Sequence, residues 1–457
     1  MKRISAVACL ALSACVTPQP TEVPQRRAIA AQVTPNMNAI STFAPQAVAR
    51  VSRSNTSVAA DFLDLSFRME SGRTIPVLSR FETPIRVALT GNVPATAARD
   101  ASALLGRLRA EAGLDIALAQ GDQANIVVQF LPRATMQAAV PNAACFVVPR
   151  VTSWDEFRAA RGTSRIDWTT LTVRDRAAIF IPSDVAPQEA RDCLHEELAQ
   201  ALGPLNDMYH LSDSVFNDDN FNAVLTGFDM LVLRTTYARE LRSGMTRAEV
   251  AARLPSILPR LNPAGGGVSA GAGVQTPRDW ISAVETALAP RSSDSARRAG
   301  AQRALAMAQA QGWTDNRRAF AHFLMGRLSM GSQIEQAVIH FAEAARFYAA
   351  LPGGALHQAH VDMQMAAFAL SSGQYDEVLR LTQRATPVVT REQNAAVLAT
   401  LQMLRAEALS ATGRGAEAQA ARLDSLGWAR YGFGSEAQVK ARLSEVSALA
   451  ARRTASR

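Results

Sequence analysis

A glycine- and alanine-rich segment, LNPAGGGVSAGAGVQTP, occupies residues 261–277 and divides the chain into two parts of different texture. Such a segment has few large side chains that could be buried in a core, and it is typical of a linker between folded units. Before it, short β-branched and aromatic runs alternate with helical patterns, and after it the pattern is alanine-rich and helical throughout. The sequence therefore predicts an α+β domain over 58–260 and an all-α domain over 278–457.

The first part carries short runs with the composition of strands, separated by helical patterns. Pro187 suits the first turn of the second helix, with Ser183 or Asp184 as its cap, and Gly203 followed by Pro204 is a strong stop. Strands are predicted at FLDLSFRM (62–69), RFETPIRVAL (80–89), ANIVVQFLP (124–132), ACFVVPR (144–150) and RAAIFIPS (176–183), and helices over 96–112, 187–202 and 220–246.

Glycines mark the turns of the second part. SMGSQIEQA, SSGQYDEVL and ATGRGAEAQ place Gly331, Gly373 and Gly413 at equivalent turns between helices, 42 and 40 residues apart. A period near forty with helix–turn–helix units predicts stacked helical hairpins, which resemble tetratricopeptide repeats. That resemblance implies a protein or peptide partner on one face of the array. A plain helical bundle without a groove is the alternative.

The first fifteen residues, MKRISAVACLALSAC, have a basic start, a short apolar segment and a small-residue ending, as a secretory signal does. The ending LSAC resembles the bacterial lipobox, which implies cleavage before Cys15 and lipidation of this cysteine. We therefore expect a signal peptide over 1–15, a flexible tether over 16–57, and a lipid-anchored protein that faces the periplasm of a bacterial cell envelope. A soluble protein with a fortuitous cysteine is the alternative.

Cys145 and Cys193 are the cysteines that remain once Cys9 is cleaved off and Cys15 carries lipid. In an oxidising envelope compartment, an even pair favours a disulfide between them. Two free buried cysteines are the alternative, because spacing alone does not prove pairing.

The charge balance is moderately basic, with 48 Lys and Arg against 40 Asp and Glu and a formal net charge of +8. The arginines are scattered along amphipathic helices, and no basic run is interleaved with aromatic residues. A solvated surface explains this excess, so we expect no nucleic-acid partner.

The stretch CLHEELAQALGPLND, residues 193–207, holds the candidate functional residues. Zinc peptidase helices of the form H-E-x-x-H-x-x-G place two ligands four residues apart on one face, with a glutamate that polarises the metal-bound water. Reading this pattern from His195 fails, because Ala199 stands at the second ligand position. Reading it one residue later gives Glu196 as first ligand, Glu197 as general base, Gln200 as second ligand, Gly203 as turn and Asn206 as third ligand, with Asp207 beside it.

The segments HEELAQALG and ND, followed by DSVFNDD and LTGFDMLVLRTTYARELRSGM, resemble a bacterial domain-of-unknown-function family related to metzincin-type peptidases. In that family, a helix of the form E-E-L-x-Q-x-L-G replaces the histidine-bearing helix. The resemblance covers residues from about 60 to about 255 and implies a zincin-like α+β fold, without a demonstrated reaction.

The expected donor set is a poor one for zinc. Zinc prefers imidazole and thiolate, whereas a Glu/Gln/Asn set offers one anionic ligand and two weak neutral ones. His195 points away from this face, and His210 and Asp207 in the next loop could supply only part of a site. We therefore expect no resident cofactor and a non-catalytic domain that keeps a peptide groove. A zinc-dependent peptidase with an atypical site, with Glu197 as its catalytic residue, is the alternative.

Lipidation of Cys15 is testable by cell fractionation. Because acyl chains on this residue are the predicted anchor, Cys15→Ser should move the protein from the membrane fraction to the soluble fraction, as measured by immunoblotting. Cys9→Ser, inside the segment that is removed, is the control and should leave the protein in the membrane fraction. Retention of the Cys15→Ser protein in membranes would count against the lipid anchor.

Overall fold

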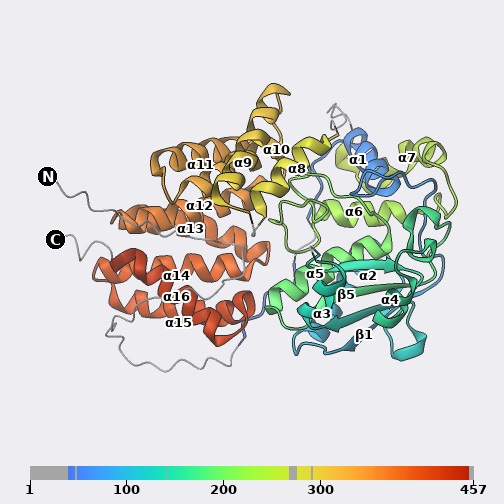
Figure 1. Ribbon diagram of the computed structural model, residues 1–457, viewed down its shortest axis with the longest axis horizontal. Coiled ribbons are helices and arrows are strands. Elements are labelled where there is room, and N and C mark those ends of the chain that lie inside the picture. The colour runs from blue at the N-terminus through green and yellow to red at the C-terminus, as the bar shows by residue number, and fades with distance from the viewer. Residues whose placement is uncertain (1–39, 47–48, 142, 267–274, 290–291, 452–457) are drawn as a thin grey trace.

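The computed structural model describes residues 40–46, 49–141, 143–266, 275–289 and 292–451. Figure 1 shows a part built around a sheet beside a stack of helices, so the predicted order of a mixed α/β region and a helical region is confirmed. The predicted signal peptide and Cys15 lie outside the described residues and remain predictions. Within the described ranges, no helix is long and apolar enough to cross a membrane.

A mixed sheet organises the first part. Its strands are β1 Ile85–Gly91, β2 Ile116–Leu118, β3 Ile126–Leu131, β4 Phe146–Pro149 and β5 Ala177–Pro182. They lie in the order β2-β1-β3-β5-β4, with β4 antiparallel to β5 at one edge and the other pairs parallel. Parallel neighbours require crossover connections, and the helices in these connections cover the faces of the sheet.

The helices of the first part are α1 Asn55–Phe67, α2 Ala97–Ala112, α3 Arg133–Ala139, α4 Trp154–Ala160, α5 Pro187–Leu202, α6 Gly227–Thr236 and α7 Arg247–Leu261. Helices α2 and α5 cover one face of the sheet and α3 and α4 the other, whereas α6 packs on α2, and α7 packs on α1 and α6. Along β5, Ile179 and Ile181 belong to the large core shared with α2 and α5. Phe180, between them, points to the other face, where its ring centroid lies 5.1 Å from that of Trp154 in α4. Both faces of β5 are therefore buried, which explains its continuous apolar run.

The alternation of FLDLSFRM predicts a strand, and this prediction is wrong. Its first six residues, 62–67, form the C-terminal part of α1. Ser54 caps this helix, since its Oγ accepts a backbone N–H three residues later at 3.1 Å. Val58, Phe62 and Leu65 recur at helical spacing and are fully buried. The helix begins at Asn55, seven residues before the predicted strand. The short run from Phe62 alone was therefore too short to distinguish a helix from a strand.

The helix predicted over 220–246 is much shorter, because α6 begins only at Gly227. The Thr226 Oγ1 accepts the Asp229 N–H at 3.2 Å, and the Asp229 carboxylate accepts the Thr226 N–H at 2.7 Å. This reciprocal capping box defines the start of a helix. The residues before it form an irregular loop that packs against the second part.

The described residues before α1 are packed, unlike the flexible tether predicted over 16–57. Phe43 lies against Trp428, with ring centroids 4.3 Å apart. The Arg53 Nε donates to the Asp213 carboxylate at 2.9 Å. Apolar and charged contacts of this kind fix the chain, so the end of the predicted tether belongs to the folded structure.

The second part consists of helical hairpins. Its helices are α8 Arg278–Leu288, α9 Asp294–Ala310, α10 Asn316–Ser329, α11 Ile334–Tyr348, α12 Gly354–Ser371, α13 Tyr375–Arg391, α14 Ala395–Ala411, α15 Gly415–Phe433 and α16 Glu436–Ala451. The predicted glycine turns are confirmed: Gly331 lies between α10 and α11, Gly373 between α12 and α13, and Gly413 between α14 and α15. Gly373 and Gly413 have φ angles of 73° and 78°, which glycine adopts most readily.

Helices α10, α12 and α14 are buried on almost every side, whereas α11, α13 and α15 keep an exposed face. The first part covers the inner helices, and two aromatic side chains from its loops, Tyr209 and Phe221, belong to the core of the second part. Phe221 lies 5.1 Å from Phe323 of α10 and 4.5 Å from His357 of α12, between ring centroids. The face on which a peptide partner was predicted therefore packs against the first part.

A buried carboxylate joins the two parts. Asp219 of the first part and His357 of α12 have fully buried side chains, and the Asp219 Oδ2 lies 3.1 Å from the His357 Nε2. The same oxygen accepts the amide Nδ2 of Asn316 in α10 at 2.6 Å and that of Asn217 at 2.9 Å. Several donors on one oxygen offset the cost of burying this charge.

Replacement of this carboxylate tests its role. Asp219→Asn should lower the free energy of unfolding by about 3 kcal/mol, because the new amide nitrogen faces donors that lose their acceptor. Urea denaturation followed by tryptophan fluorescence measures the change. Asp376→Asn on the exposed side of α13 is the matched control, with an expected effect within about 0.5 kcal/mol. Equal effects of the two substitutions would contradict a joint that depends on Asp219.

Candidate functional site

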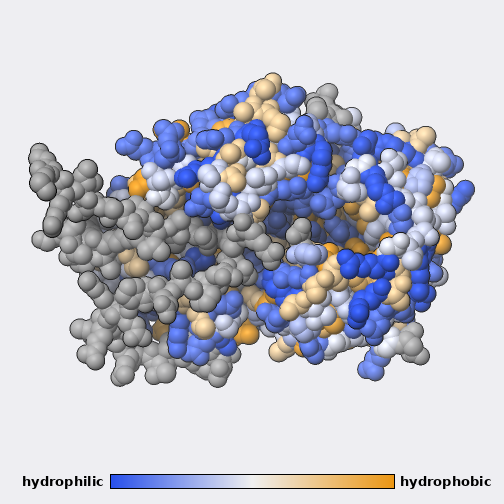
Figure 2. All heavy atoms as spheres, in the orientation of Figure 1, coloured by the Kyte–Doolittle hydropathy of each residue, from blue (hydrophilic) through white to orange (hydrophobic). Residues whose placement is uncertain are grey.

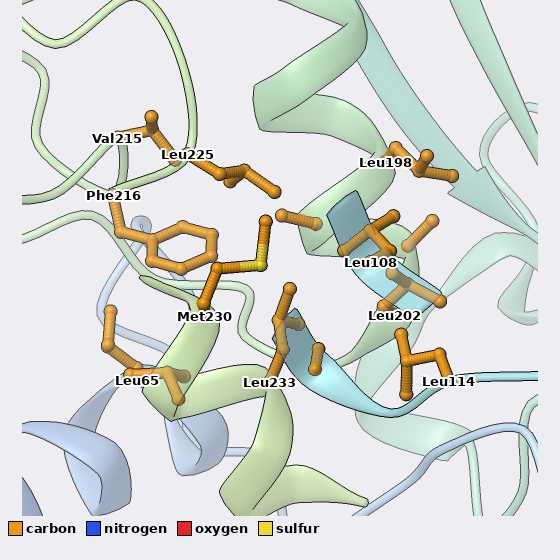
Figure 3. Packing of buried hydrophobic residues seen from close by; sticks show 14 of the residues in the cluster. Leu65, Leu108, Leu114, Leu198, Leu202, Val215, Phe216, Leu225, Met230 and Leu233 are labelled. Atoms are coloured by element: carbon orange, nitrogen blue, oxygen red, sulfur yellow. The ribbon is translucent and has the colours of Figure 1, made fainter. Parts of the chain in front are cut away.

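The candidate helix, α5, is placed by β5 and by the core. It begins at Pro187, as predicted, but the residue before it, Ala186, makes no side-chain cap. The predicted cap residue Asp184 instead accepts the Arg133 N–H at 2.8 Å. Figure 3 shows Leu198 and Leu202 of α5 among the buried side chains of the large core. The apolar stripe of α5 therefore faces inward, as its spacing predicts.

The predicted disulfide between Cys145 and Cys193 is present, with the two Cα atoms 5.9 Å apart. Cys145 directly precedes β4, and Cys193 lies in the second turn of α5. The bond therefore fixes the N-terminal half of α5 to the edge of the sheet, which is a structural role.

His195 is a core residue. Its side chain is only 4% exposed, and its Nδ1 accepts the backbone N–H of Leu225 at 3.1 Å. Burial, reinforced by Arg191 and Arg107, holds the pKa of His195 well below its usual value, so the ring is neutral. With one nitrogen occupied by the backbone, His195 supports the loop before α6 and does not face the candidate site.

Glu196 and Glu197 are adjacent acidic residues in the C-terminal half of α5. Burial, followed by repulsion from Asp218 and Glu70, raises the pKa of Glu196 to about 8. Glu197 is 5% exposed, and its Oε2 has no hydrogen-bond partner in the described structure. Burial and repulsion from Glu196 and Glu70 raise its pKa well above the usual value. The two neighbours therefore hold protons at a pH where exposed carboxyls are ionised.

The helix ends at Gly203, where the chain turns back. A Cβ at this glycine would lie 2.9 Å from the Thr236 Cγ2 of α6, so no larger side chain fits. After the turn, Asp207 returns to α5 and accepts the Gln200 Nε2 at 3.2 Å. Asn206, which the shifted register assigns to the third ligand position, instead donates to a backbone carbonyl of α1 at 3.2 Å. The returning residue is therefore Asp207.

Arg174 holds this end of α5 and was not identified from the sequence. It is 3% exposed and donates to the carbonyls of Ala201 at 2.7 Å and Gly203 at 2.6 Å. Its guanidinium carbon also lies 4.8 Å from the ring centroid of Trp168. Burial lowers the pKa of Arg174 to about 10, which leaves it charged at neutral pH. A cation at a helix C-terminus satisfies the last carbonyls and the negative end of the dipole.

Carboxyl groups from three segments repel one another near the Gly203 turn. Burial, and then repulsion from Asp218, Glu196, Glu70 and Glu197, raise the pKa of Asp207 well above its usual value. Asp218 responds in the same way, with a pKa of about 7. Within the part of the chain that the structure describes, no three His, Cys, Asp or Glu side chains are grouped so that they could hold a metal ion.

A cleft of about 460 Å³ lies beside this cluster, between the end of α1 and the start of α8. Asp207 and Glu70 line it from the first part, and Arg278 lines it from α8. His210 lines it as well, with its Nε2 2.9 Å from the buried Asp61 carboxylate and its Nδ1 without a partner in the described structure. In the view of Figure 2, the surface that is not covered by grey atoms is mostly hydrophilic, with scattered hydrophobic residues.

Residues 55–256 match the family model described as "Protein of unknown function (DUF2927)". This match confirms a domain of unknown function. Its bounds are close to those of the predicted resemblance, which runs from about residue 60 to about residue 255. No curated protein and no solved structure matches the chain.

The raised carboxyl pKa values predict a pH-dependent stability. In the unfolded chain these groups lose their protons near pH 4, whereas folded Asp218 and Glu196 keep them to about pH 7 and about pH 8. Between these limits the folded state binds more protons, so its stability falls as the pH rises. Glu196→Gln removes one such group. Between about pH 5.5 and about pH 8, the melting temperature of this variant should fall by a few degrees less than the melting temperature of the wild type does.

Differential scanning fluorimetry at both values measures this difference. Glu335→Gln, on the exposed side of α11, is the matched control and should reproduce the wild-type pH dependence. A Glu196→Gln protein with the wild-type pH dependence would show that this carboxyl is ionised in the folded state.

Proposed function

We propose that this chain, which carries a DUF2927 domain, is an envelope lipoprotein whose first part is a non-catalytic, zincin-like domain that binds a peptide. The single observation that carries the proposal is the return of Asp207 to Gln200 after the Gly203 turn. A zincin helix uses such a turn to bring a third ligand to the second. Here the corresponding contact is a hydrogen bond between an amide and a carboxyl group.

The surrounding fold supports the zincin-like assignment. Helix α5 directly follows the buried strand β5, its apolar stripe faces the sheet, and Glu196 and Gln200 lie half-buried on its other side. Arg174 and the close contact of Gly203 with α6 fix the point at which the chain turns. These contacts support a scaffold of the kind that presents ligands in a peptidase.

The residues at the ligand positions do not fit zinc. The Gln200 nitrogen is directed at Asp207, and Asn206 is engaged with the backbone of α1. Burial and repulsion hold the pKa of Glu196 and of Asp207 above the usual range, and a carboxyl group must lose its proton before it binds a metal. With no suitable ligand set, Glu197 has no metal-bound water to activate, which favours binding over catalysis.

For the second part, we propose tetratricopeptide-like hairpins that brace the first part and complete its binding surface. The inner helices pack on the first part through Asp219 and Phe221, so part of their surface is occupied from within the same chain. Arg278 at the start of α8, however, lines the cleft opposite Asp207. We therefore place the protein or peptide partner in this shared cleft and propose that the lipid on Cys15 holds the assembly at the membrane.

Metal analysis of the purified full chain tests the non-catalytic assignment. After equilibration with zinc and desalting, mass spectrometry of the metal content should find well below one zinc per chain. The double substitution Glu196→Ala/Gln200→Ala should leave this value unchanged, because these residues hold no metal.

Glu335→Ala/Gln336→Ala, on the exposed surface of α11, is the matched control for nonspecific zinc at glutamate and glutamine side chains. One zinc per chain that disappears in Glu196→Ala/Gln200→Ala and persists in this control would overturn the proposal in favour of an atypical peptidase.

A further inference from the structure

Buried polar atoms around the cleft lack hydrogen-bond partners in the described structure, among them the Oδ1 of Asp207, the Oε2 of Glu197 and the Nδ1 of His210. The Oδ1 of Asp64 also belongs to this set, but it lies 3.0 Å from the Arg247 guanidinium. Buried polar groups in folded proteins are almost always paired, so unpaired ones that gather at one site indicate a missing partner. The Asp207 and His210 side chains line the cleft directly. Glu197 is only 5% exposed, and it lies close enough to Asp207 and Glu70 for the three carboxyl groups to repel one another.

The chemistry of these atoms defines what the partner must supply. Once a ligand displaces their protons, the carboxylates of Asp207 and Glu197 only accept hydrogen bonds, so this ligand must donate them. It must also bring positive charge, because the carboxylates of Glu70, Glu196 and these two residues repel one another when ionised. A charge-assisted hydrogen bond to such a group is roughly twice as strong as a neutral one.

The arginines of the cleft neutralise this cluster only in part, because Arg278 lowers the pKa of Asp218 but is paired with another carboxylate. The Arg278 Nη2 lies 2.9 Å from the Glu285 carboxylate of its own helix. Arg68 directly follows α1, and its Nε lies 3.9 Å from the carboxylate of Asp64, which belongs to α1. Both guanidinium groups are engaged elsewhere, so the unpaired oxygen of Asp207 is left for a ligand.

We propose that the cleft binds the side chain of an arginine or lysine from a peptide partner, with its cationic head at Asp207 and Glu70. This inference rests on the proposed peptide-binding function and names the side chain that is recognised. Met69, Met208 and Ile281 line the same cleft and offer an apolar surface to the methylene stem of such a side chain. A bare metal ion fits less well, since the carboxyl groups do not converge as a ligand set in the described residues.

The test uses the full chain and three fluorescein-labelled peptides with the sequence Gly-Ser-Ala-Gly-X-Gly-Ala-Ser-Gly, where X is arginine, citrulline or glutamate. Citrulline has the shape of arginine without its charge. Fluorescence polarisation in EDTA should give about tenfold tighter binding of the arginine peptide than of the citrulline peptide, and no binding of the glutamate peptide.

Variants of the cleft assign the effect to these residues. Asp207→Asn and Glu197→Gln should each reduce the preference for arginine over citrulline several-fold, whereas Arg278→Gln should strengthen binding of the arginine peptide by removing a competing charge. Asp279→Asn, an exposed acid next to Arg278 that does not line the cleft, is the matched control. Because the first two substitutions relieve repulsion, the melting temperature of each variant should equal or exceed that of the wild type.

Equal affinity for the arginine and citrulline peptides, or no binding of either, overturns the inference of a cationic side-chain site. So does a preference for arginine that persists in Asp207→Asn and Glu197→Gln. Mass spectrometry of the peptides after incubation with zinc and without EDTA is read separately. Cleavage of a peptide would overturn the non-catalytic function itself, whichever side chain the cleft prefers.

Discussion

The buried carboxylate of Asp219 holds the loop on which the cleft depends. Its Oδ2 binds His357 and Asn316 of the second part, and the Asn316 amide also donates to the Tyr209 carbonyl at 2.8 Å. The segment between the Gly203 turn and α6 is thus fixed to α10 and α12. Because Asp207 lies in this segment, the geometry of the candidate site is set by contacts between the two parts. Such buried polar contacts are directional, so they fix position more than apolar packing alone does.

This joint changes the role of the helical part. A free array of hairpins would present its inner helices to a partner, but here Phe221 and Tyr209 fill that surface from within the same chain. Contacts at the other end of the interface act in the same way: the Tyr431 hydroxyl donates to Asp100 of α2 at 2.8 Å, and the Gln188 side chain of α5 accepts the Ala396 N–H at 2.9 Å. The linker composition therefore marks a boundary in secondary structure, while the two parts form one packed unit.

Local patterns predicted the elements better than their assembly. The stop at Gly203, the apolar stripe of α5 and the glycine turns of the hairpins each follow from spacing within one short stretch, and all are present. The disulfide is also present, but it was predicted by counting the cysteines that remain in the mature chain. Arg174 and Asp219 were missed because each acts on residues far away in the sequence, and nothing in their neighbours marks them. The capping of α1 by Ser54 was missed because a polar-rich stretch before Phe62 was read as tether. The shifted register names Asn206 with Asp207 beside it, and in the structure Asp207 contacts Gln200 while Asn206 contacts the backbone of α1. Spacing alone does not decide which of two neighbours faces α5 after a turn.

The carboxyl cluster is a local contrast in a chain with a formal net charge of +8. Bringing several acids together in a partly buried region costs free energy, and the folded protein lowers this cost by keeping protons on them near neutral pH. A proton is replaceable, however, and a cationic side chain that enters the cleft stabilises the ionised carboxylates in its place. Binding of such a ligand must therefore release protons and relieve repulsion at the same time. The mutual repulsion of these carboxyl groups then becomes a source of specificity. A neutral side chain would neither displace their protons nor pair with their free oxygens.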